Sequence, residues 1–324
     1  MLLSVAAVIA GFIFLVWGAE RCVMGASATA RNFGVSPLII GLTIVGFGTS
    51  APEMLVAGVA SSEGNPGLAI GNALGSNITN IALVLGVTAL VTTLTVGSNV
   101  VRREIPILLA VSLFAFWLMS DGVLSFIDGL LLIGGMLTMI ALVVRLGIKS
   151  SNGEDPVESE FEEEIPADMP MGKAVFWTVL GIVVLLASSK MLVWGAVNIA
   201  QAFGVSDLII GLTIVAIGTS MPELMASVMS ALKNEHDLAI GNIIGSNMFN
   251  LLGVLALPGL IAPGAFDPQV LSRDLPWMVG LTLALFVMAY GFRGPGKITR
   301  WEGGVLLLAY SGYMVWLYQS AMGA

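Results

Sequence analysis

Apolar stretches separated by short polar segments occupy most of the 324-residue chain. Each stretch is close to the roughly 20 residues that a helix needs to cross the hydrocarbon core of a bilayer. The pattern therefore predicts an all-α integral membrane protein with ten membrane-spanning helices. The predicted spans are 2–30, 37–62, 68–92, 104–121, 127–148, 173–201, 207–232, 238–260, 274–292 and 301–320.

One hydrophilic segment separates the first five predicted spans from the last five. Residues 150–172 hold eight of the 21 acidic residues, together with several prolines and serines. Such a composition cannot bury an apolar core, so a flexible solvated linker is favoured over a calcium-sensing element. We expect a five-helix unit at 1–149, the acidic linker, and a second five-helix unit at 173–324.

The two halves of the chain repeat each other. FGVSPLIIGLTIVGFGTSAPE at 33–53 matches FGVSDLIIGLTIVAIGTSMPE at 203–223, with 17 of 21 positions identical. LAIGNALGSNITN at 68–80 matches LAIGNIIGSNMFN at 238–250, with nine of 13 identical, and both matches are offset by 170 residues. Because each half has an odd number of predicted spans, the second copy enters the membrane from the opposite side. This predicts an inverted repeat, an architecture common among secondary transporters.

Basic residues in the predicted loops are distributed asymmetrically between the two sides of the membrane. Alternate loops on one side hold ten lysines and arginines, whereas the opposite loops hold only Arg273. Basic loops tend to stay in the cytoplasm. We therefore expect a cytoplasmic-membrane protein with both termini outside and the 150–172 linker in the cytoplasm.

The second predicted span carries a proline and a carboxylate near its middle, in the stretch GTSAPE. Thr49 and Ser50 lie one helical turn before Glu53 and share its face. Pro52 has no N–H group, so the carbonyl of Gly48 loses its usual helical partner. One carboxylate, two hydroxyls and a freed carbonyl are hard oxygen ligands, which suit Ca²⁺, Mg²⁺ or Na⁺. The second copy repeats the set in GTSMPE, with Pro222 and Glu223.

The third predicted span supplies a polar stripe, because Asn72, Ser76 and Asn80 recur every four residues along one face. Asn242, Ser246 and Asn250 repeat the stripe in the eighth span. Pairing of the inverted halves brings Glu53 and Glu223 together near the bilayer midplane. A Ca²⁺ ion between two carboxylates is electroneutral, and the same cage could hold Na⁺ instead. Neither GTSAPE nor GTSMPE is then a site by itself, and each is half of one.

The composition excludes several other classes of function. The chain is 57% hydrophobic and 10% charged, with a mean hydropathy of +0.96, and no basic patch indicates a nucleic-acid partner. The single cysteine, Cys22, cannot form an intramolecular disulfide. An intramembrane enzyme needs a nucleophile and a base at depth, but the only histidine, His236, falls in a predicted solvated loop. Glu20 and Lys190, at equivalent positions in the two repeats, are predicted to make a polar contact.

The paired GTS-x-PE and GN-x-x-GSN-x-x-N motifs resemble the cation/Ca²⁺ antiporter superfamily, and most closely its prokaryotic Na⁺/Ca²⁺ exchanger branch. The motif blocks cover 33–80 and 203–250, about 30% of the chain. Cation/H⁺ exchangers of the superfamily typically carry a glutamate in the GN-containing helix, which this chain lacks. Some relatives have an aspartate where this chain has Asn250, and that aspartate is linked with K⁺ dependence.

The resemblance implies a row of cation sites across the second, third, seventh and eighth helices, of which the second and seventh are broken. Glu53 and Glu223, with the backbone carbonyls of Thr49 and Thr219, would bind Ca²⁺, and Asn80 and Asn250 would face this central position. Flanking Na⁺ sites would use two symmetric sets of residues. These are Gly46, Thr49, Ser50, Glu53 and Ser76 on one side, and Ala216, Thr219, Ser220, Glu223 and Ser246 on the other.

The favoured interpretation is a secondary antiporter, not an enzyme, that exchanges Na⁺ for Ca²⁺ by alternating access. The resemblance implies that the long first and sixth helices slide against the rest during this cycle. The alternative is an antiporter of the same fold that exchanges Ca²⁺ or another cation for H⁺, or that depends on K⁺. The expected partners are Ca²⁺, Na⁺ and membrane lipid. We expect a functional monomer with no permanently bound cofactor.

Overall fold

The computed structural model describes residues 1–35, 40, 46–96, 99–150, 169–289 and 296–322. Helices dominate these ranges, with short 3-10 and π-helical segments (η) and four short strands. The first half contains α1 (Leu2–Asn32), α3 (Gly46–Thr49), α4 (Ala51–Ser62), α5 (Pro66–Ile78), η2 (Thr79–Val84), α6 (Leu85–Val91), β1 (Leu94–Val96), α7 (Asn99–Leu118), η3 (Met119–Asp121), β2 (Val123–Leu124) and α8 (Phe126–Ser150).

The second half has a similar order of elements. It contains α10 (Met171–Phe203), α11 (Asp207–Ile210), η4 (Gly211–Val215), α12 (Ala216–Thr219), α13 (Met221–Leu232), α14 (His236–Phe249), η5 (Asn250–Val254), α15 (Ala256–Ile261), β3 (Gly264–Ala265), η6 (Val270–Asp274), α16 (Leu275–Ala289), β4 (Gly296–Ile298) and α17 (Arg300–Met322). The predicted linker falls mostly within 151–168, which lies outside the described residues.

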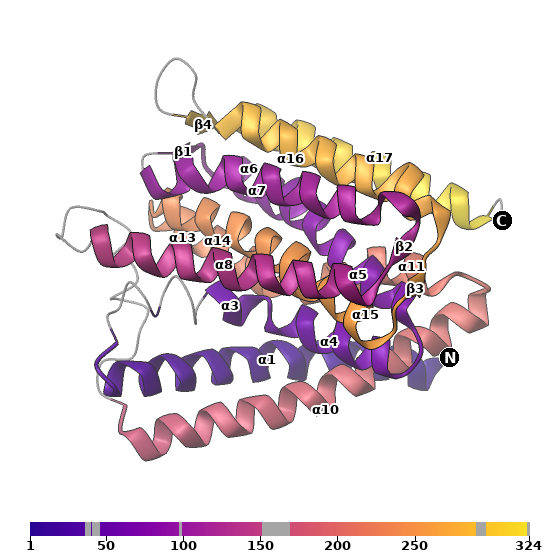
Figure 1. Cartoon of the computed structure of the whole chain (residues 1–324), viewed down its shortest axis with the longest axis horizontal. Helices are drawn as coiled ribbons and strands as arrows, with labels where there is room; N and C mark the ends of the chain where they lie inside the picture. Colours follow the sequence, from indigo (N-terminus) through magenta and orange to yellow (C-terminus); the bar gives the residue numbers. More distant parts are fainter. Residues whose placement is uncertain (36–39, 41–45, 97–98, 151–168, 290–295, 323–324) are drawn as a thin grey trace.

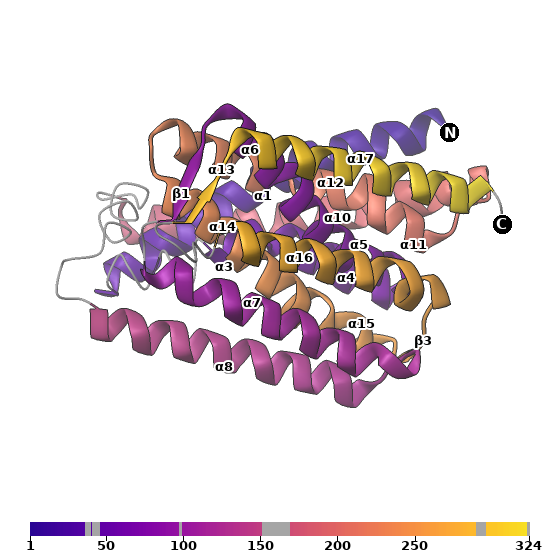
Figure 2. The same cartoon turned by 90° about the horizontal axis from the view of Figure 1, so that it is seen from above.

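The long helices run roughly along one common axis, as the first two views show (Figures 1 and 2). Both chain termini lie at one end of the bundle, which we call the terminal end, together with the antiparallel pair β2–β3. The antiparallel pair β1–β4 lies at the opposite end, where α8 ends and α10 begins. We call this the linker end. The two ends match the two sides of the membrane that the loop charges predict.

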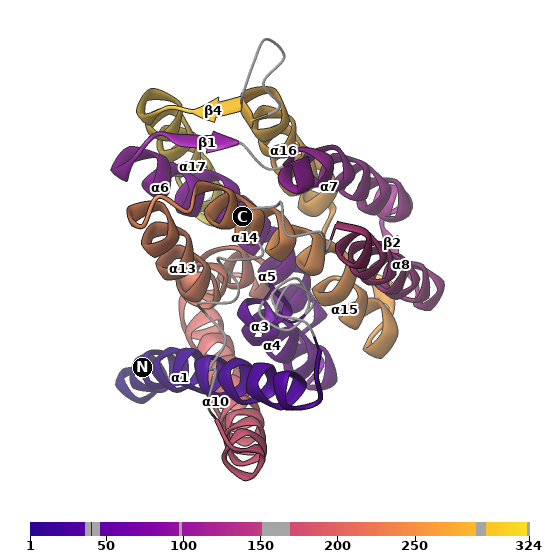
Figure 3. The same cartoon turned by 90° about the vertical axis from the view of Figure 1, so that its left-hand side faces the viewer.

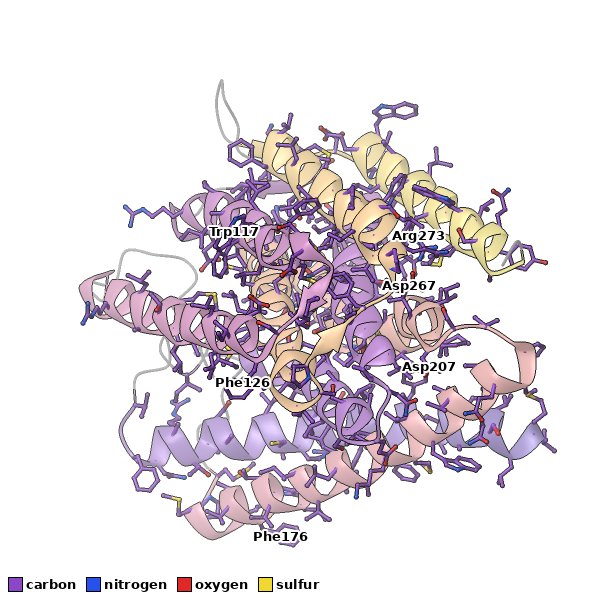
Figure 4. All side chains as sticks on the ribbon, turned by 45° about the vertical axis from the view of Figure 1, so that its right-hand side comes forward. Trp117, Phe126, Phe176, Asp207, Asp267 and Arg273 are labelled. Atoms are coloured by element: carbon purple, nitrogen blue, oxygen red, sulfur yellow. The ribbon has the colours of Figure 1, made fainter. Side chains whose placement is uncertain are left out.

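Among the described residues, six helices are long and apolar enough to cross a membrane. The pair Asp207–Thr219 and Met221–Leu232, bent by 42° at Ser220, makes a seventh if it is counted as one span. Exposed aromatic side chains such as Trp117, Phe126 and Phe176 cover the periphery of the bundle (Figure 4). The protein is therefore a helical membrane protein, and the count of ten spans remains a prediction.

The break that the two GTS-x-PE motifs predict is present in both copies. Helix α3 ends at Thr49 and α4 begins at Ala51, with Ser50 between them. Helix α12 ends at Thr219 and α13 begins at Met221, with Ser220 between them. A proline without an N–H group is tolerated in the first turn of a helix but not in its interior. Pro52 and Pro222 accordingly lie in the first turns of α4 and α13.

Equivalent residues of the two halves meet where α7 packs on α16. Ser112 Oγ lies 3.5 Å from Thr282 Oγ1, and these two positions are separated by the 170-residue offset of the repeat. Each hydroxyl donates its proton to the carbonyl one turn earlier, of Leu108 and Met278 respectively, and contacts the other hydroxyl through its oxygen atom. Two equivalent residues can contact each other only where they lie close to the axis that relates the halves. The contact therefore indicates a two-fold axis between α7 and α16.

Helices α1 and α10 pack against each other along a line of small residues. A Cβ added at Gly11, Gly18 or Gly25 would lie within 3.2 Å of α10. Their equivalents Gly181 and Gly195 approach α1 just as closely. Such small residues allow two helix backbones to approach within a membrane.

The predicted contact between Glu20 and Lys190 is wrong. Gly18 lies against Leu185 and Gly11 against Leu192, so in this antiparallel register Glu20 is level with Val183 and Lys190 with Ile13. The two charged residues are therefore separated by about 10 Å along the axis. Both are exposed, and no salt bridge joins them among the described residues.

A buried polar cluster joins the start of α16 to α17 near the terminal end. Arg273 Nε donates to Asp274 Oδ1 at 2.6 Å, and the Tyr313 hydroxyl donates to the same oxygen at 2.8 Å. Arg273 also donates to the side-chain oxygen of Gln269. Trp277 stacks on the Tyr313 ring with centroids 5.7 Å apart. Figure 4 shows Arg273 at this junction. Because every charge of the cluster is paired, it can be buried without the cost of an isolated ion.

Candidate cation-binding site

Glu53 and Glu223 occupy equivalent places in the first turns of α4 and α13. The amino end of a helix carries a partial positive charge, which favours a carboxylate there. Shortly before each glutamate, α3 and α12 end at Thr49 and Thr219. Each break thus places a carboxylate close to the carboxyl end of the preceding short helix, where the backbone carbonyl groups point along the helix axis.

The two glutamates are fully buried at the centre of the molecule. Both have 0% exposed surface, and their carboxyl groups are close enough to interact electrostatically. Seen end-on, the helices around them lie between the α1–α10 pair and the α16–α17 pair (Figure 3). Two like charges buried together are strongly unfavourable unless something of opposite charge compensates them.

Oxygen atoms without hydrogen-bond partners surround this centre. All carboxylate oxygens of Glu53 and Glu223 are buried and unpaired, and so are the hydroxyls of Ser50 and Ser220. The side-chain amides of Asn80 and Asn250 are unpaired as well. Buried polar atoms in native proteins nearly always have a partner, so a cluster of exceptions indicates a bound species.

Hydroxyl groups link the two repeats in two symmetric pairs. Thr49 Oγ1 lies 3.2 Å from Ser246 Oγ, and the equivalent atoms Thr219 Oγ1 and Ser76 Oγ are 3.4 Å apart. Each pair therefore joins a broken helix of one repeat to a GN-containing helix of the other. The predicted ligands come together in this way because the halves interlock rather than lie side by side.

Asn80 and Asn250 both lie in π-helical segments, η2 and η5, which follow α5 and α14. A π-helical turn inserts one extra residue and turns side chains away from their regular helical direction, and such turns are frequent at functional sites. The two asparagines are completely buried. Sequence periodicity alone placed them on a regular helical stripe, so their π-helical geometry is a new observation.

The remaining predicted residues lie where the two breaks begin. Gly46 and Ala216 are the first residues of α3 and α12, one turn before Ser50 and Ser220. Pro52 and Pro222 follow the breaks directly. Every residue predicted for the site therefore belongs to the two broken helices, to α5 and α14, or to the π-helical turns that follow them.

Asn72 contributes more than its place on the polar stripe indicated. Its Nδ2 donates to the backbone carbonyl of Glu53 at 3.2 Å, and its Oδ1 accepts from the Thr219 hydroxyl at 3.2 Å. It therefore orients the carboxylate-bearing turn of one repeat and the hydroxyl of the other. The repetition of Gly-Asn at 71–72 and 241–242 is the signal in the sequence that marks this position.

The donor set fits a hard cation and no soft metal. Carboxylates, hydroxyls, amides and carbonyls are oxygen ligands of the kind that Ca²⁺ and Na⁺ prefer. Within the described ranges, no group of three or more His, Cys, Asp or Glu side chains could hold a metal. His236 is not a solvated loop residue, because it begins α14 and its Nδ1 lies 2.9 Å from Thr95 Oγ1.

The geometry agrees with the family to which the sequence is similar. The family model for the sodium/calcium exchanger protein matches residues 3–145 and 173–319. The chain belongs to the sodium/calcium exchanger family. The unmatched residues between the two blocks correspond to the predicted acidic linker, and each block contains one GTS-x-PE motif.

Relatives in other organisms match along nearly the full length of this exchanger-family chain. The candidate antiporter CaxA of Alkalimonas amylolytica is 48% identical over 99% of this chain and 100% of its own length. The sodium/calcium exchanger MaX1 of Methanosarcina acetivorans is 30% identical over 95% of this chain and 96% of its own. The family and these relatives support cation/Ca²⁺ antiport by a multi-pass membrane transporter.

The sodium-calcium exchanger NCX_Mj is similar in three dimensions. One of its structures is 33% identical and superimposes with a TM-score of 0.67, covering 97% of this chain and 98% of NCX_Mj. The likeness in sequence and in three dimensions therefore extends over nearly the whole of both chains.

Proposed function

We propose that this protein is a secondary antiporter that exchanges Na⁺ for Ca²⁺ across the cytoplasmic membrane. The observation that carries the proposal is the buried cluster of unpaired oxygen atoms at Glu53 and Glu223, where two equivalent helix breaks meet. A divalent cation between two carboxylates removes the electrostatic penalty of burying them. Two Na⁺ ions would neutralise the same charge, which gives a physical basis for exchange at one set of ligands.

Ca²⁺ is proposed to bind between Glu53 and Glu223, with the carbonyls of Thr49 and Thr219 and with Asn80 and Asn250 facing it. Na⁺ is proposed to occupy flanking positions that reuse the same glutamates. These positions are assigned to Gly46, Thr49, Ser50 and Ser76, and to Ala216, Thr219, Ser220 and Ser246. The hydroxyl pairs that join the repeats support this assignment, because they hold both sets of ligands around one centre.

The proposed architecture is ten spans in two inverted five-helix repeats that expose the site to either side in turn. The contact between Ser112 and Thr282 and the symmetric hydroxyl pairs support the inverted relation. The charge bias of the predicted loops supports an orientation with both termini outside and the acidic linker in the cytoplasm. The protein is proposed to act as a monomer.

Reconstitution into proteoliposomes tests the proposed exchange. Ca²⁺ uptake is followed while an outward gradient of Na⁺, H⁺ or K⁺ is imposed in turn at a clamped membrane potential. We expect uptake that requires the Na⁺ gradient and stops when that gradient collapses. Uptake that follows the H⁺ gradient without Na⁺ would instead establish the alternative, a Ca²⁺/H⁺ antiporter of the same fold. A requirement for K⁺ in addition to Na⁺ would establish K⁺ dependence.

A further inference from the structure

The equivalent asparagines Asn72 and Asn242 make different hydrogen bonds. Asn72 is fully buried and bridges the two repeats, from the Glu53 carbonyl to the Thr219 hydroxyl. Asn242 is only half-buried, and its Nδ2 donates to Ser227 Oγ at 3.2 Å within its own repeat. The sequence is duplicated at these positions, but the contacts are not.

The difference coincides with a substitution between the repeats. Ser227 is fully buried on α13, where its hydroxyl accepts from Asn242 and donates to the Ala239 carbonyl at 3.4 Å. The equivalent position in the first repeat is Ala57, which is also fully buried and has no polar side-chain atom. Asn242 therefore has a partner within its own repeat that Asn72 lacks.

The two asparagines are displaced toward opposite ends of the bundle. Helix α5 begins at the terminal end, so Asn72 is nearer that end than Asn80 is; α14 begins at the linker end, so Asn242 is nearer the linker end than Asn250 is. Around Asn72 the packing is tight. A Cβ added at Gly71 would lie 2.4 Å from the Leu208 carbonyl oxygen, and one added at Gly211 would lie 2.4 Å from that of Leu68. The terminal side of the site is thus closed by backbone contact.

We propose that Asn72 and Asn242 are positioning residues that exchange roles during transport. Ser227 shifts the equilibrium between the two states toward the one in which Asn72 bridges the repeats and the terminal side is closed. In the opposite state, Asn242 leaves Ser227 and bridges the Glu223 carbonyl to the Thr49 hydroxyl. Asn72 then releases Glu53 and Thr219, and the terminal side opens. The inference deepens the proposed antiport and rests on its alternating access, in which inverted repeats take up each other's arrangement.

The size of the bias follows from the bond that Ser227 supplies. A single intramolecular hydrogen bond changes an equilibrium by about two- to tenfold. Ser227→Ala removes the bond that holds Asn242 and shifts the population by this factor toward the opposite state. Ala57→Ser is the matched reciprocal change, because it adds one oxygen atom where Asn72 can bind it and shifts the population the same way. The double variant moves the hydroxyl from the second repeat to the first, so its shift toward the opposite state should be larger than that of either single variant.

The variants differ in which asparagine they affect. Ser227→Ala frees Asn242 to close the linker side, whereas Ala57→Ser holds Asn72 away from its bridge and opens the terminal side. Both changes favour the state in which the terminal side, at residues 66–76, is open and the linker side, at residues 236–246, is closed. The reverse shift is expected from Asn242→Ala, which removes the bridge that the opposite state needs.

Hydrogen–deuterium exchange of the full-length protein in detergent, without Na⁺ or Ca²⁺, tests the proposal. For Ser227→Ala and Ala57→Ser we expect backbone exchange to become about two- to tenfold faster in 66–76 and slower in 236–246. For Asn242→Ala we expect exchange in 66–76 to become slower. A side chain with a merely structural role would speed up exchange in both segments together, because it would loosen the packing without changing which side is closed.

The proposal is overturned if exchange in the two segments changes in the same direction in both Ser227→Ala and Ala57→Ser, or does not change at all. The measurement uses no transported ion, so its outcome is separate from that of the flux experiment. If hydrogen exchange changes in opposite directions in the two segments but no Na⁺-driven Ca²⁺ uptake is observed, the exchange of roles between Asn72 and Asn242 stands and Na⁺/Ca²⁺ antiport is refuted. If Na⁺-driven uptake is observed without these opposite changes, antiport stands and the exchange of roles is refuted.

Discussion

At the scale of single residues, the site depends on groups that would be unfavourable in any other membrane helix. A buried carboxylate, a proline and an unpaired amide each cost stability in hydrocarbon. The sequence predicted a site of glutamates, hydroxyls and asparagines because two copies have identical spacing, and these side chains are buried together. It did not identify the bridging contacts of Asn72 or the partner of His236, because both depend on residues far away in the chain.

Replacing either central glutamate tests the residue assignment most directly. Glu53→Gln and Glu223→Gln each remove one of the two charges that would balance Ca²⁺, and a unit-charge interaction at about 4 Å is worth about 4 kcal/mol at an effective dielectric constant of 20. We expect Ca²⁺ affinity to fall by about a thousandfold, measured by calorimetric titration, and Ca²⁺ flux to be abolished.

The matched control is Glu63→Gln, which changes an exposed carboxylate just after α4. It should retain Ca²⁺ affinity and flux. Without bound cation, neither central variant should melt at a lower temperature than the original protein, because glutamine relieves a buried repulsion. Retained Ca²⁺ transport in a correctly folded Glu53→Gln or Glu223→Gln variant would remove that residue from the site.

At the scale of elements, the pattern of apolar stretches predicted the helices well but not how they contact one another. Predicted spans such as 68–92 and 238–260 match Pro66–Val91 and His236–Ile261 within two residues. The π-helical turns η2 and η5 were not predicted, because a π turn changes hydrogen bonding without changing the apolar pattern. The Glu20–Lys190 contact failed because sequence equivalence does not give the register of two packed helices.

The close packing of α1 and α10 at their glycines gives a prediction for these two helices. A Cβ at Gly181 would lie 2.5 Å from the Cys22 backbone nitrogen, and backbone atoms cannot move aside as a flexible side chain can. We expect Gly181→Ala to separate the two helices and to lower the free energy of unfolding by about 1–3 kcal/mol. Thermal unfolding in detergent measures the change.

Gly280→Ala is the control for this prediction. Gly280 lies inside α16, is exposed, and an added Cβ would have no atom within 4 Å. Because alanine favours helix over glycine, this variant should be neutral or slightly more stable. Equal destabilisation by both substitutions would mean that helix backbone effects, rather than the close approach of α1 and α10, decide the result.

At the scale of the whole molecule, duplication in the sequence predicted that two half-sites meet, and the structure brings Glu53 and Glu223 together. The offset of 170 residues and the odd number of predicted spans in each half were sufficient for that inference. They were not sufficient to show that each broken helix bonds to the opposite repeat, as Thr49 does to Ser246. Such interlocking is decided by packing among many helices at once, which no local pattern contains.

Orientation in the membrane is a property of the whole molecule and can be tested with two cysteine probes in a Cys22→Ala background. Lys233→Cys reports the linker end and Ala265→Cys the terminal end, since both positions are exposed. We expect a membrane-impermeant maleimide to label Ala265→Cys in intact spheroplasts and Lys233→Cys only in inverted vesicles. The opposite labelling would reverse the proposed orientation, and labelling of both probes from one side would refute the predicted topology.

The hydroxyl contact between Ser112 and Thr282 bears on how such a molecule can arise from a single gene of half the length. In a symmetric dimer of identical half-length chains, any residue on the two-fold axis faces its own copy. A carboxylate or an ammonium group would repel itself there, whereas a hydroxyl carries no charge and can donate its single proton to its own helix while it contacts its twin. Ser112 and Thr282 meet that condition, because each donates to a carbonyl one turn earlier in its own helix.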